Sequence, residues 1–167
     1  MSKGFILLVY KLPQQPTRLR IQAWRRLQAL GAVYLQDGIA ALPLRPDLEE
    51  NLRYVAESMI QSGGTAISLR ASTCSEADDE EIEGRFRAAA DVRMSDVLAS
   101  LEKIRASADE VGTLEGVSKV DDALKRERIA YLKARRLNYF GSDLEKVVES
   151  RLAELSDRLA RFGGSHK

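Results

Sequence analysis

Short apolar runs alternate with amphipathic stretches over the first 70 residues. Runs rich in β-branched and aromatic residues, bounded by Pro or Gly, indicate strands, and apolar positions recurring every three to four residues indicate helices. The dipeptide Asp37-Gly38 favours a tight hairpin turn. The pattern predicts strands over 5–10, 32–36, 39–43 and 65–69, and helices over 18–30 and 47–62. This order, β-α-β-β-α-β, predicts an α+β fold, the ferredoxin-like arrangement of a four-stranded sheet with two helices on one face.

The helix expected over 18–30 has a candidate cap in Thr17 and a terminator in Gly31. Its apolar face is formed by Leu19, Ala23, Leu27 and Leu30. Trp24 lies at the edge of this face, so we expect it to be part of the core rather than a stacking platform. Arg20 also points toward this face, and we expect its stem to pack there while its guanidinium reaches a carboxylate or carbonyl.

Strand signals vanish from Ser75 onward, where Ala, Leu, Glu, Arg and Lys dominate. We therefore expect two domains, a ferredoxin-like domain over 1–74 and a helical extension over 75–167. The extension is predicted to hold helices near 78–108, 119–139 and 143–162, joined by segments 112–116 and 141–142.

Composition excludes several classes of function. The chain has 167 residues, of which 44% are hydrophobic and 31% charged, with a net charge of +1. No apolar run approaches the roughly 18 residues of a membrane span, so we expect a cytoplasmic protein without a membrane partner. Cys74 is the only cysteine and His166 the only histidine, which excludes an internal disulfide and argues against a zinc site or a histidine-based triad. We predict no catalytic residue, no metal and no cofactor.

Charge is distributed in blocks along the chain. The net charge is +4 over 1–75, −6 over 76–111 and +3 over 112–167. Such blocks suggest a surface that faces a polyanion, beside an acidic spacer. Six acids lie within the eight residues 76–83, and we interpret them as a solvated helix N-terminus capped by Thr73 or Ser75. An alternative is that this tract competes with DNA for a basic helix.

Residues 125–136 are the most informative segment, with six basic residues and one acid. Helical geometry places four of these cations within about 100° of arc, around Ile129 and opposite an apolar packing face. The four are Lys125, Arg126, Lys133 and Arg136. Such a stripe can lie in or along a DNA groove and neutralise phosphates. The alternative is a solvated face whose cations form weak ion pairs with the acidic segment.

Spaced motifs in the first 43 residues resemble one known family. They are Tyr10-Lys-Leu-Pro13, Arg18-Leu-Arg20, Ala23-Trp-Arg25-Arg26-Leu27, Leu30-Gly31-Ala32, Leu35-Gln-Asp37-Gly38 and Leu42-Pro43. The pattern is similar to the N-terminal domain of the chromate-resistance regulator ChrB, and the later elements are similar in layout to that domain. The resemblance implies a chromate-responsive transcriptional repressor that binds operator DNA. Full-length members carry a second, C-terminal domain, so we expect a stand-alone relative or a truncated member.

If the protein binds DNA, the basic helix is expected to make most phosphate contacts and the first helix to add others. The predicted DNA-binding residues are Arg18, Arg25, Arg26, Lys125, Arg126, Arg128, Lys133, Arg135 and Arg136. A pocket for chromate, as effector, is predicted at the start of the first helix, where backbone donors and guanidinium groups are close in sequence. Its residues are Thr17, Arg18 and Arg20.

A near-heptad apolar stripe follows the last predicted helix. It consists of Leu144, Val148, Leu152, Leu155, Leu159 and Phe162. Such a stripe requires another helix, which is either the helix over 78–108 of the same chain or a second copy of the stripe itself. Because bacterial repressors often read two half-sites as dimers, we expect a homodimer.

Two other functions stay open. The first strand, first helix and hairpin look, more distantly, like the ferredoxin-like domains of phenylacetate-pathway repressors and of the small CRISPR-associated endonuclease, which implies a nuclease or an RNA-binding protein. Metal-dependent members of that endonuclease family are expected to carry an Asp just after the first-strand Tyr, where this chain has Lys11. An ammonium group cannot ligate a metal, which argues against cleavage. The other function is a helical oligomerisation or scaffold protein without nucleic-acid binding.

Overall fold

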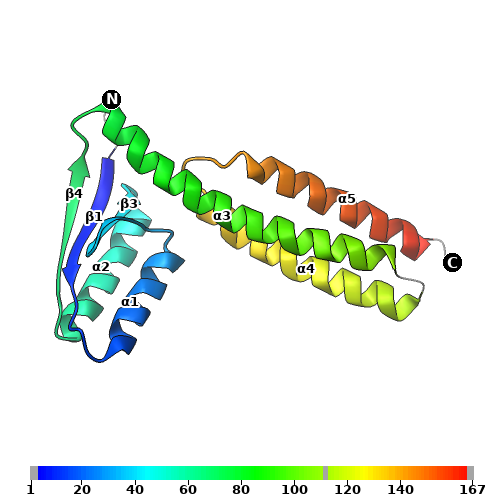
Figure 1. The fold of residues 1–167 in the computed structure, drawn as a ribbon, viewed down its shortest axis with the longest axis horizontal. Coiled ribbons are helices and arrows are strands. Elements are labelled where there is room, and N and C mark those ends of the chain that lie inside the picture. The colour runs from blue at the N-terminus through cyan, green and yellow to red at the C-terminus, as the bar shows by residue number, and fades with distance from the viewer. Residues whose placement is uncertain (1–3, 111–112, 165–167) are drawn as a thin grey trace. The chain divides into compact units, whose positions relative to one another are not determined.

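The computed structural model describes residues 4–110 and 113–164. Over these residues the chain is an α+β protein with a four-stranded antiparallel sheet and five helices (Figure 1). It divides into two compact units, unit 1 ending at Phe86 and unit 2 beginning at Arg87. The amino-acid composition changes near residue 75, but the boundary between the two units falls later, inside a helix. The first turns of that helix belong to unit 1, and Arg85 is hydrogen-bonded to the sheet there. Its guanidinium donates to the carbonyl oxygen of Tyr34 at 2.8 Å.

Unit 1 has the predicted order of strands and helices along the chain, with ends that differ from the prediction by at most three residues. Its elements are β1 (Gly4–Lys11), α1 (Thr17–Ala29), β2 (Val33–Gln36), β3 (Ile39–Pro43), α2 (Pro46–Gln61) and β4 (Thr65–Ser72). The strand order is β2-β3-β1-β4, and all neighbouring strands are antiparallel. Helices α1 and α2 lie on the same side of the sheet (Figure 1).

The core of unit 1 lies between the sheet and these two helices. Its fully buried residues include Ile6 and Leu8 of β1, Leu42 of β3, Leu27 of α1 and Leu52 of α2. Alternation along β1 places Ile6 and Leu8 on one side of the sheet. The buried residues of α1 are Ala23 and Leu27, so the face of the helix that carries them packs on this core.

The hairpin turn predicted at Asp37-Gly38 is present between β2 and β3. Gly38 has a φ of +77°, a conformation that costs most residues about 1–2 kcal/mol. The amide of Tyr10 donates to the Gly38 carbonyl oxygen at 2.8 Å. A Cβ on Gly38 would lie only 2.5 Å from the Tyr10 carbonyl oxygen. The turn and the close approach of β1 therefore both require glycine.

Three predictions about α1 are wrong. Pro16 rather than Thr17 occupies the N-cap position, and no side chain caps the helix. Trp24 is 52% exposed, because the buried arc of α1 is already filled by Ala23 and Leu27 and Trp24 lies on its flank. Arg20 is exposed, and among the described residues it has no hydrogen bond or ion pair, so the expected carboxylate or carbonyl partner is absent.

Unit 2 is helical. Helix α3 (Glu76–Asp109) begins in unit 1 and continues into unit 2, where α4 (Leu114–Arg136) and α5 (Leu144–Gly164) follow. Helix α4 begins five residues earlier than predicted, because Thr113 caps it by accepting the Gly116 amide at 3.2 Å. Gly112 of the predicted linker and His166 lie outside the described residues. Over the described ranges, every helix is too short or too polar to span a bilayer.

The apolar stripe of α5 packs within its own chain except at Phe162, which is 37% exposed. Val148, Leu152 and Leu155 are at most 7% exposed and share one core cluster with residues of α3 and α4. Leu144 and Leu159 are partly buried against the same cluster. Of the two partners left open for the stripe, the structure shows the one in the same chain.

The acidic tract at the start of α3 is only partly solvated. Ser75 caps the helix as predicted, accepting the Asp78 amide at 3.2 Å. Asp79 and Glu83, however, are buried, with 9% and 4% exposure. The Thr73 hydroxyl donates to the Asp79 carboxylate at 2.6 Å. The interpretation as a solvated N-terminus is therefore wrong for these two acids, which are part of the fold of unit 1.

Candidate nucleic-acid interface

Helix α4 is amphipathic, with one side in the core of unit 2. Its buried residues are Val120, Leu124, Tyr131 and Ala134. The Tyr131 hydroxyl donates to Glu149 of α5 at 2.6 Å, and burial together with this hydrogen bond raises the pKa of Tyr131. At about 100° per residue, the opposite side of the helix is centred near Ile129, which is 56% exposed. The predicted separation of a packing side from an outer side is confirmed.

Two of the six predicted cations on α4 lie beside α5. Arg135 pairs with Glu145 of α5, with 3.1 Å between guanidinium and carboxylate. Arg128 donates to the hydroxyl of Ser156, also on α5, at 2.7 Å. Both arginines are exposed, so phosphate could replace these partners. In the Arg135–Glu145 pair the arginine side chain is 56% exposed and the glutamate side chain 24% exposed, and breaking an ion pair at a protein surface costs on the order of 1 kcal/mol.

The other four cations lie on the side of α4 that points away from the core. Lys125 pairs with Asp121 at 2.6 Å, and this hydrogen bond raises the pKa of the lysine. Within the described residues, Arg126, Lys133 and Arg136 are exposed and make no hydrogen bond or ion pair. We refer to these three cations, with Ile129 between them, as the outer face of α4. Its charge is available to an anionic partner.

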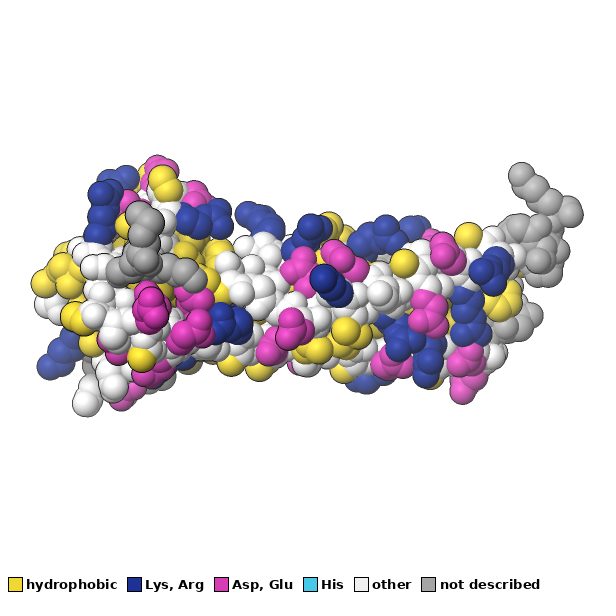
Figure 2. All heavy atoms as spheres, turned by 90° about the horizontal axis from the view of Figure 1, so that it is seen from above, with side chains coloured by type: hydrophobic (Ala, Val, Ile, Leu, Met, Phe, Trp, Pro, Cys, Tyr) yellow, Lys and Arg dark blue, Asp and Glu magenta, His cyan; other side chains and the backbone are white. Residues whose placement is uncertain are grey.

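Side chains of both signs cover the helices of unit 2. Figure 2 shows basic and acidic groups interspersed along this part of the chain. Several cations are neutralised locally. The pairs include Arg105 with Glu102, Lys119 with Glu115 and Arg158 with Asp109. Lys103 and Lys146 are also exposed and unpaired among the described residues, so what distinguishes the outer face of α4 is that three such cations share one side of one helix.

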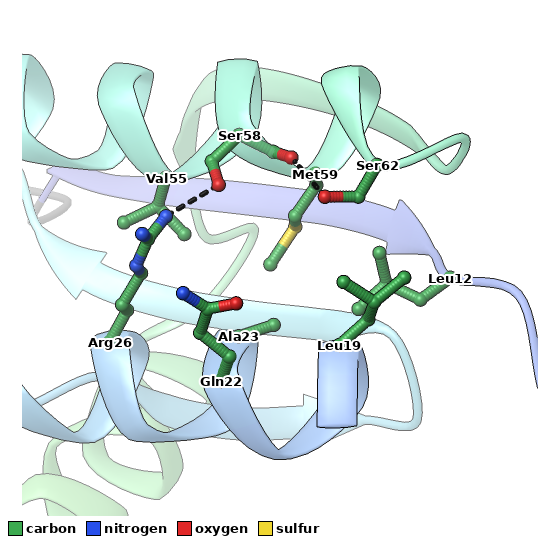
Figure 3. Close-up of a pocket in the computed structure, with 9 residues that line it drawn as sticks. All are labelled: Leu12, Leu19, Gln22, Ala23, Arg26, Val55, Ser58, Met59 and Ser62. Carbon is green, nitrogen blue, oxygen red and sulfur yellow. Dashed lines mark hydrogen bonds between the residues drawn. The ribbon is translucent and has the colours of Figure 1, made fainter. Parts of the chain in front are cut away.

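Helix α1 carries the predicted auxiliary cations on two different sides. Arg18 and Arg25, seven residues apart, share an outer side of the helix, where both are exposed. Arg26 instead donates to the hydroxyl of Ser58 on α2. It lines a small pocket between α1 and α2, with its side chain turned toward Ser58 (Figure 3). Arg26 therefore does not join the other two in one patch.

The residues of the predicted oxyanion pocket are not brought together. Thr17, Arg18 and Arg20 are all exposed. Residues two apart on an α-helix are separated by about 200°, so Arg18 and Arg20 extend to different sides of α1. The hydroxyl of Thr17 does not cap the helix. These three side chains thus do not converge on one position.

Helix α1 presents a second surface that the sequence analysis did not predict. Ile21 and Trp24 are 46% and 52% exposed on its solvent side. Helical geometry places Arg20 on one flank of this apolar pair and Arg18 and Arg25 on the other. One signal could have revealed this surface, because α1 contains four arginines and no acidic residue.

Comparison with known proteins identifies the family. The family described as protein ChrB, N-terminal, matches residues 20–165. Protein ChrB of Cupriavidus metallidurans is 33% identical over 85 residues, which are 51% of this chain and 25% of that relative. The aligned part thus spans about a quarter of the relative's length. No solved structure matches the chain. Because the family match runs from α1 into the last residues, this chain belongs to the family of ChrB N-terminal domains.

Proposed function

We propose that this protein is a cytoplasmic DNA-binding transcriptional repressor, or the DNA-binding domain of one, that acts in chromate resistance. The observation that carries the proposal is the outer face of α4. Arg126, Lys133 and Arg136 are exposed there and unpaired among the described residues. Cations on one side of a helix can neutralise the phosphates that flank a DNA groove. Membership of the ChrB family supports the chromate setting.

Exposed apolar side chains lie among these cations. Ile129 is 56% exposed and Leu132 is 49% exposed. In the major groove, apolar side chains can contact the methyl group of thymine, while arginine can bridge two acceptors of guanine. We therefore propose that α4 enters a groove with its outer face toward the DNA.

The number of cations that engage DNA determines how binding depends on salt. Three phosphate contacts give a slope of about −2.7 for log affinity against log salt, or roughly a 40-fold loss between 50 and 200 mM. If Lys125, Arg128 and Arg135 exchange their present partners for phosphate, the slope approaches about −5. A salt series therefore reports how many of the six cations bind.

We infer that unit 1 is a ferredoxin-like domain. Its element order β-α-β-β-α-β and its antiparallel strand order β2-β3-β1-β4 support this assignment. In this proposal unit 1 positions the arginines of α1 as additional contacts to DNA.

A homodimer is part of the proposal, because two copies can read two half-sites. Helix α5 does not support it, since its apolar stripe is packed within its own chain. Strand β4 is the better surface, because it lies at the edge of the sheet and carries Ile67 and Leu69, 61% and 47% exposed. An open edge with exposed apolar side chains favours pairing with another strand.

The test is a mobility-shift titration of the DNA upstream of the protein's own operon. It is run over a salt series, with and without chromate and with and without magnesium. We expect a salt-sensitive shift that chromate weakens, without cleavage of the DNA. Magnesium-dependent cleavage would assign a nuclease instead, and the absence of a shift at low salt would favour a scaffold. A shift that chromate leaves unchanged would remove chromate as the effector and retain DNA binding.

A further inference from the structure

The solvent side of α1 has an apolar centre between two cationic flanks. Ile21 and Trp24 form the centre, at 46% and 52% exposure. At about 100° per residue, Arg20 lies on one flank and Arg18 and Arg25 on the other. We refer to these five residues as the outer face of α1.

Nothing in the described part of the chain neutralises this face. Arg18, Arg20 and Arg25 are exposed and have no hydrogen bond or ion pair there. Helix α1 itself contains no acidic residue. The outer face of α1 is therefore complementary to a polyanion along its flanks and to a flat apolar group at its centre.

We propose that the outer face of α1 binds single-stranded nucleic acid, with the indole of Trp24 stacked on an unpaired base and the three arginines on the flanking phosphates. Stacking on an aromatic side chain combined with a cationic track is the general way in which proteins hold single strands. In a duplex the faces of the bases are covered by their neighbours, so stacking on Trp24 is favoured where a base is unpaired. The choice of a nucleic acid as partner rests on the proposed function, but the surface belongs to unit 1 and is separate from the outer face of α4.

A membrane surface fits this face less well. An interfacial helix buries a continuous apolar side in the bilayer. The apolar side of α1, which includes Ala23 and Leu27, is already buried in unit 1. Its large exposed apolar residues are Ile21 and Trp24, which form too small a patch to anchor a helix. A single base needs no more than one indole.

The sole tryptophan makes the test specific to this face. The whole chain is titrated with oligo(dT) while the fluorescence of Trp24 is followed, and we expect saturable quenching. A labelled oligo(dT) measures the affinity of the variants by polarisation. Trp24→Ala weakens binding by about 5- to 150-fold, whereas Trp24→Phe retains most of the affinity.

The matched control is Tyr54→Ala on α2. Tyr54 is also an exposed aromatic of unit 1, at 55%, and Arg53 lies 5.0 Å from its ring centre. Arg53, unlike the three arginines of the outer face of α1, is paired with Glu57 at 3.4 Å. We expect Tyr54→Ala to bind oligo(dT) as tightly as the unaltered protein.

Three outcomes would overturn the inference. Trp24→Ala could bind oligo(dT) with unchanged affinity. Polyphosphate, which has no bases, could quench Trp24 as strongly as oligo(dT), which would show that charge alone accounts for the binding. Vesicles of anionic lipid could shift the Trp24 emission while oligo(dT) does not, which would assign a membrane surface.

The same samples separate this inference from the proposed function. Glutamine substitutions on the outer face of α4 should weaken duplex binding and leave quenching by oligo(dT) unchanged. A protein that shifts duplex DNA but shows no quenching keeps the proposed function and loses the inference. A protein that is quenched by oligo(dT) but fails to shift duplex DNA keeps the inference and loses the proposed function.

Discussion

The triple variant Arg126→Gln, Lys133→Gln, Arg136→Gln is expected to lose on the order of 10²- to 10³-fold in affinity for duplex DNA at about 0.1 M salt. Each phosphate contact contributes roughly 0.9 powers of ten at this salt concentration relative to 1 M, and the variant removes three. Glutamine is a good helix former, and among the described residues these side chains have no partner to lose. The affinity should therefore fall while the helical content stays constant. Mobility-shift titration and circular dichroism measure the two quantities.

A charge-matched variant separates specific contact from net charge. Arg105→Gln, Lys119→Gln and Arg158→Gln remove the same total charge from unit 2. These three cations are neutralised by carboxylates in the folded chain. We expect this control to bind DNA within a few-fold of the unaltered protein. Equal losses in the two triple variants would show that the outer face of α4 makes no specific contact.

Leu155→Ala is expected to lower the free energy of unfolding by about 2–5 kcal/mol. Leu155 is 1% exposed in the core cluster of unit 2, and its truncation leaves a cavity that the three helices cannot fill without moving. Chemical denaturation followed by far-ultraviolet circular dichroism measures the change.

Val147→Ala on the same helix is the control for this prediction. Val147 is 47% exposed, so its truncation should change the free energy of unfolding by no more than about 0.5 kcal/mol. Sedimentation of both variants should give the same mass as the unaltered protein. A fall in mass for Leu155→Ala without a loss of stability would show that the α5 stripe joins two copies instead of packing within one.

Local patterns were sufficient to predict the elements of unit 1. The hairpin follows from Asp37-Gly38, because the left-handed conformation at Gly38 is a local property of the chain. The start of α4 was missed for an equally local reason. Thr113 stands next to Gly112 in a segment typical of a linker, and its capping role depends on the geometry of the turn that follows. Gly and Thr alone do not distinguish a linker from a capped helix start.

The candidate site was only half predictable. Periodicity correctly placed Arg126, Lys133 and Arg136 opposite the packing side of α4. It could not show that Arg135 forms an ion pair with Glu145 or that Arg128 donates a hydrogen bond to Ser156, because these partners belong to another helix. Such pairings depend on how two helices pack, which helical spacing within one of them does not specify.

The exposure of Trp24 also could not be predicted from helical spacing alone. Its apolar character and its place beside Ala23 and Leu27 favoured burial, yet it is half exposed. Whether a residue at the margin of an apolar face is covered depends on the neighbouring elements. Because the sheet and α2 cover only the centre of that face, Trp24 remains in contact with solvent.

The most direct measurement is photo-cross-linking from the centre of the outer face of α4. A benzoylphenylalanine in place of Ile129, which is 56% exposed, removes no cation, and the same group in place of Val92 of α3, which is 62% exposed, is the control. If α4 lies against DNA, irradiation with the upstream duplex gives a covalent adduct from position 129 and little from position 92. Adducts of equal yield from both positions, or none from position 129 under conditions where the duplex is bound, would contradict DNA binding by α4.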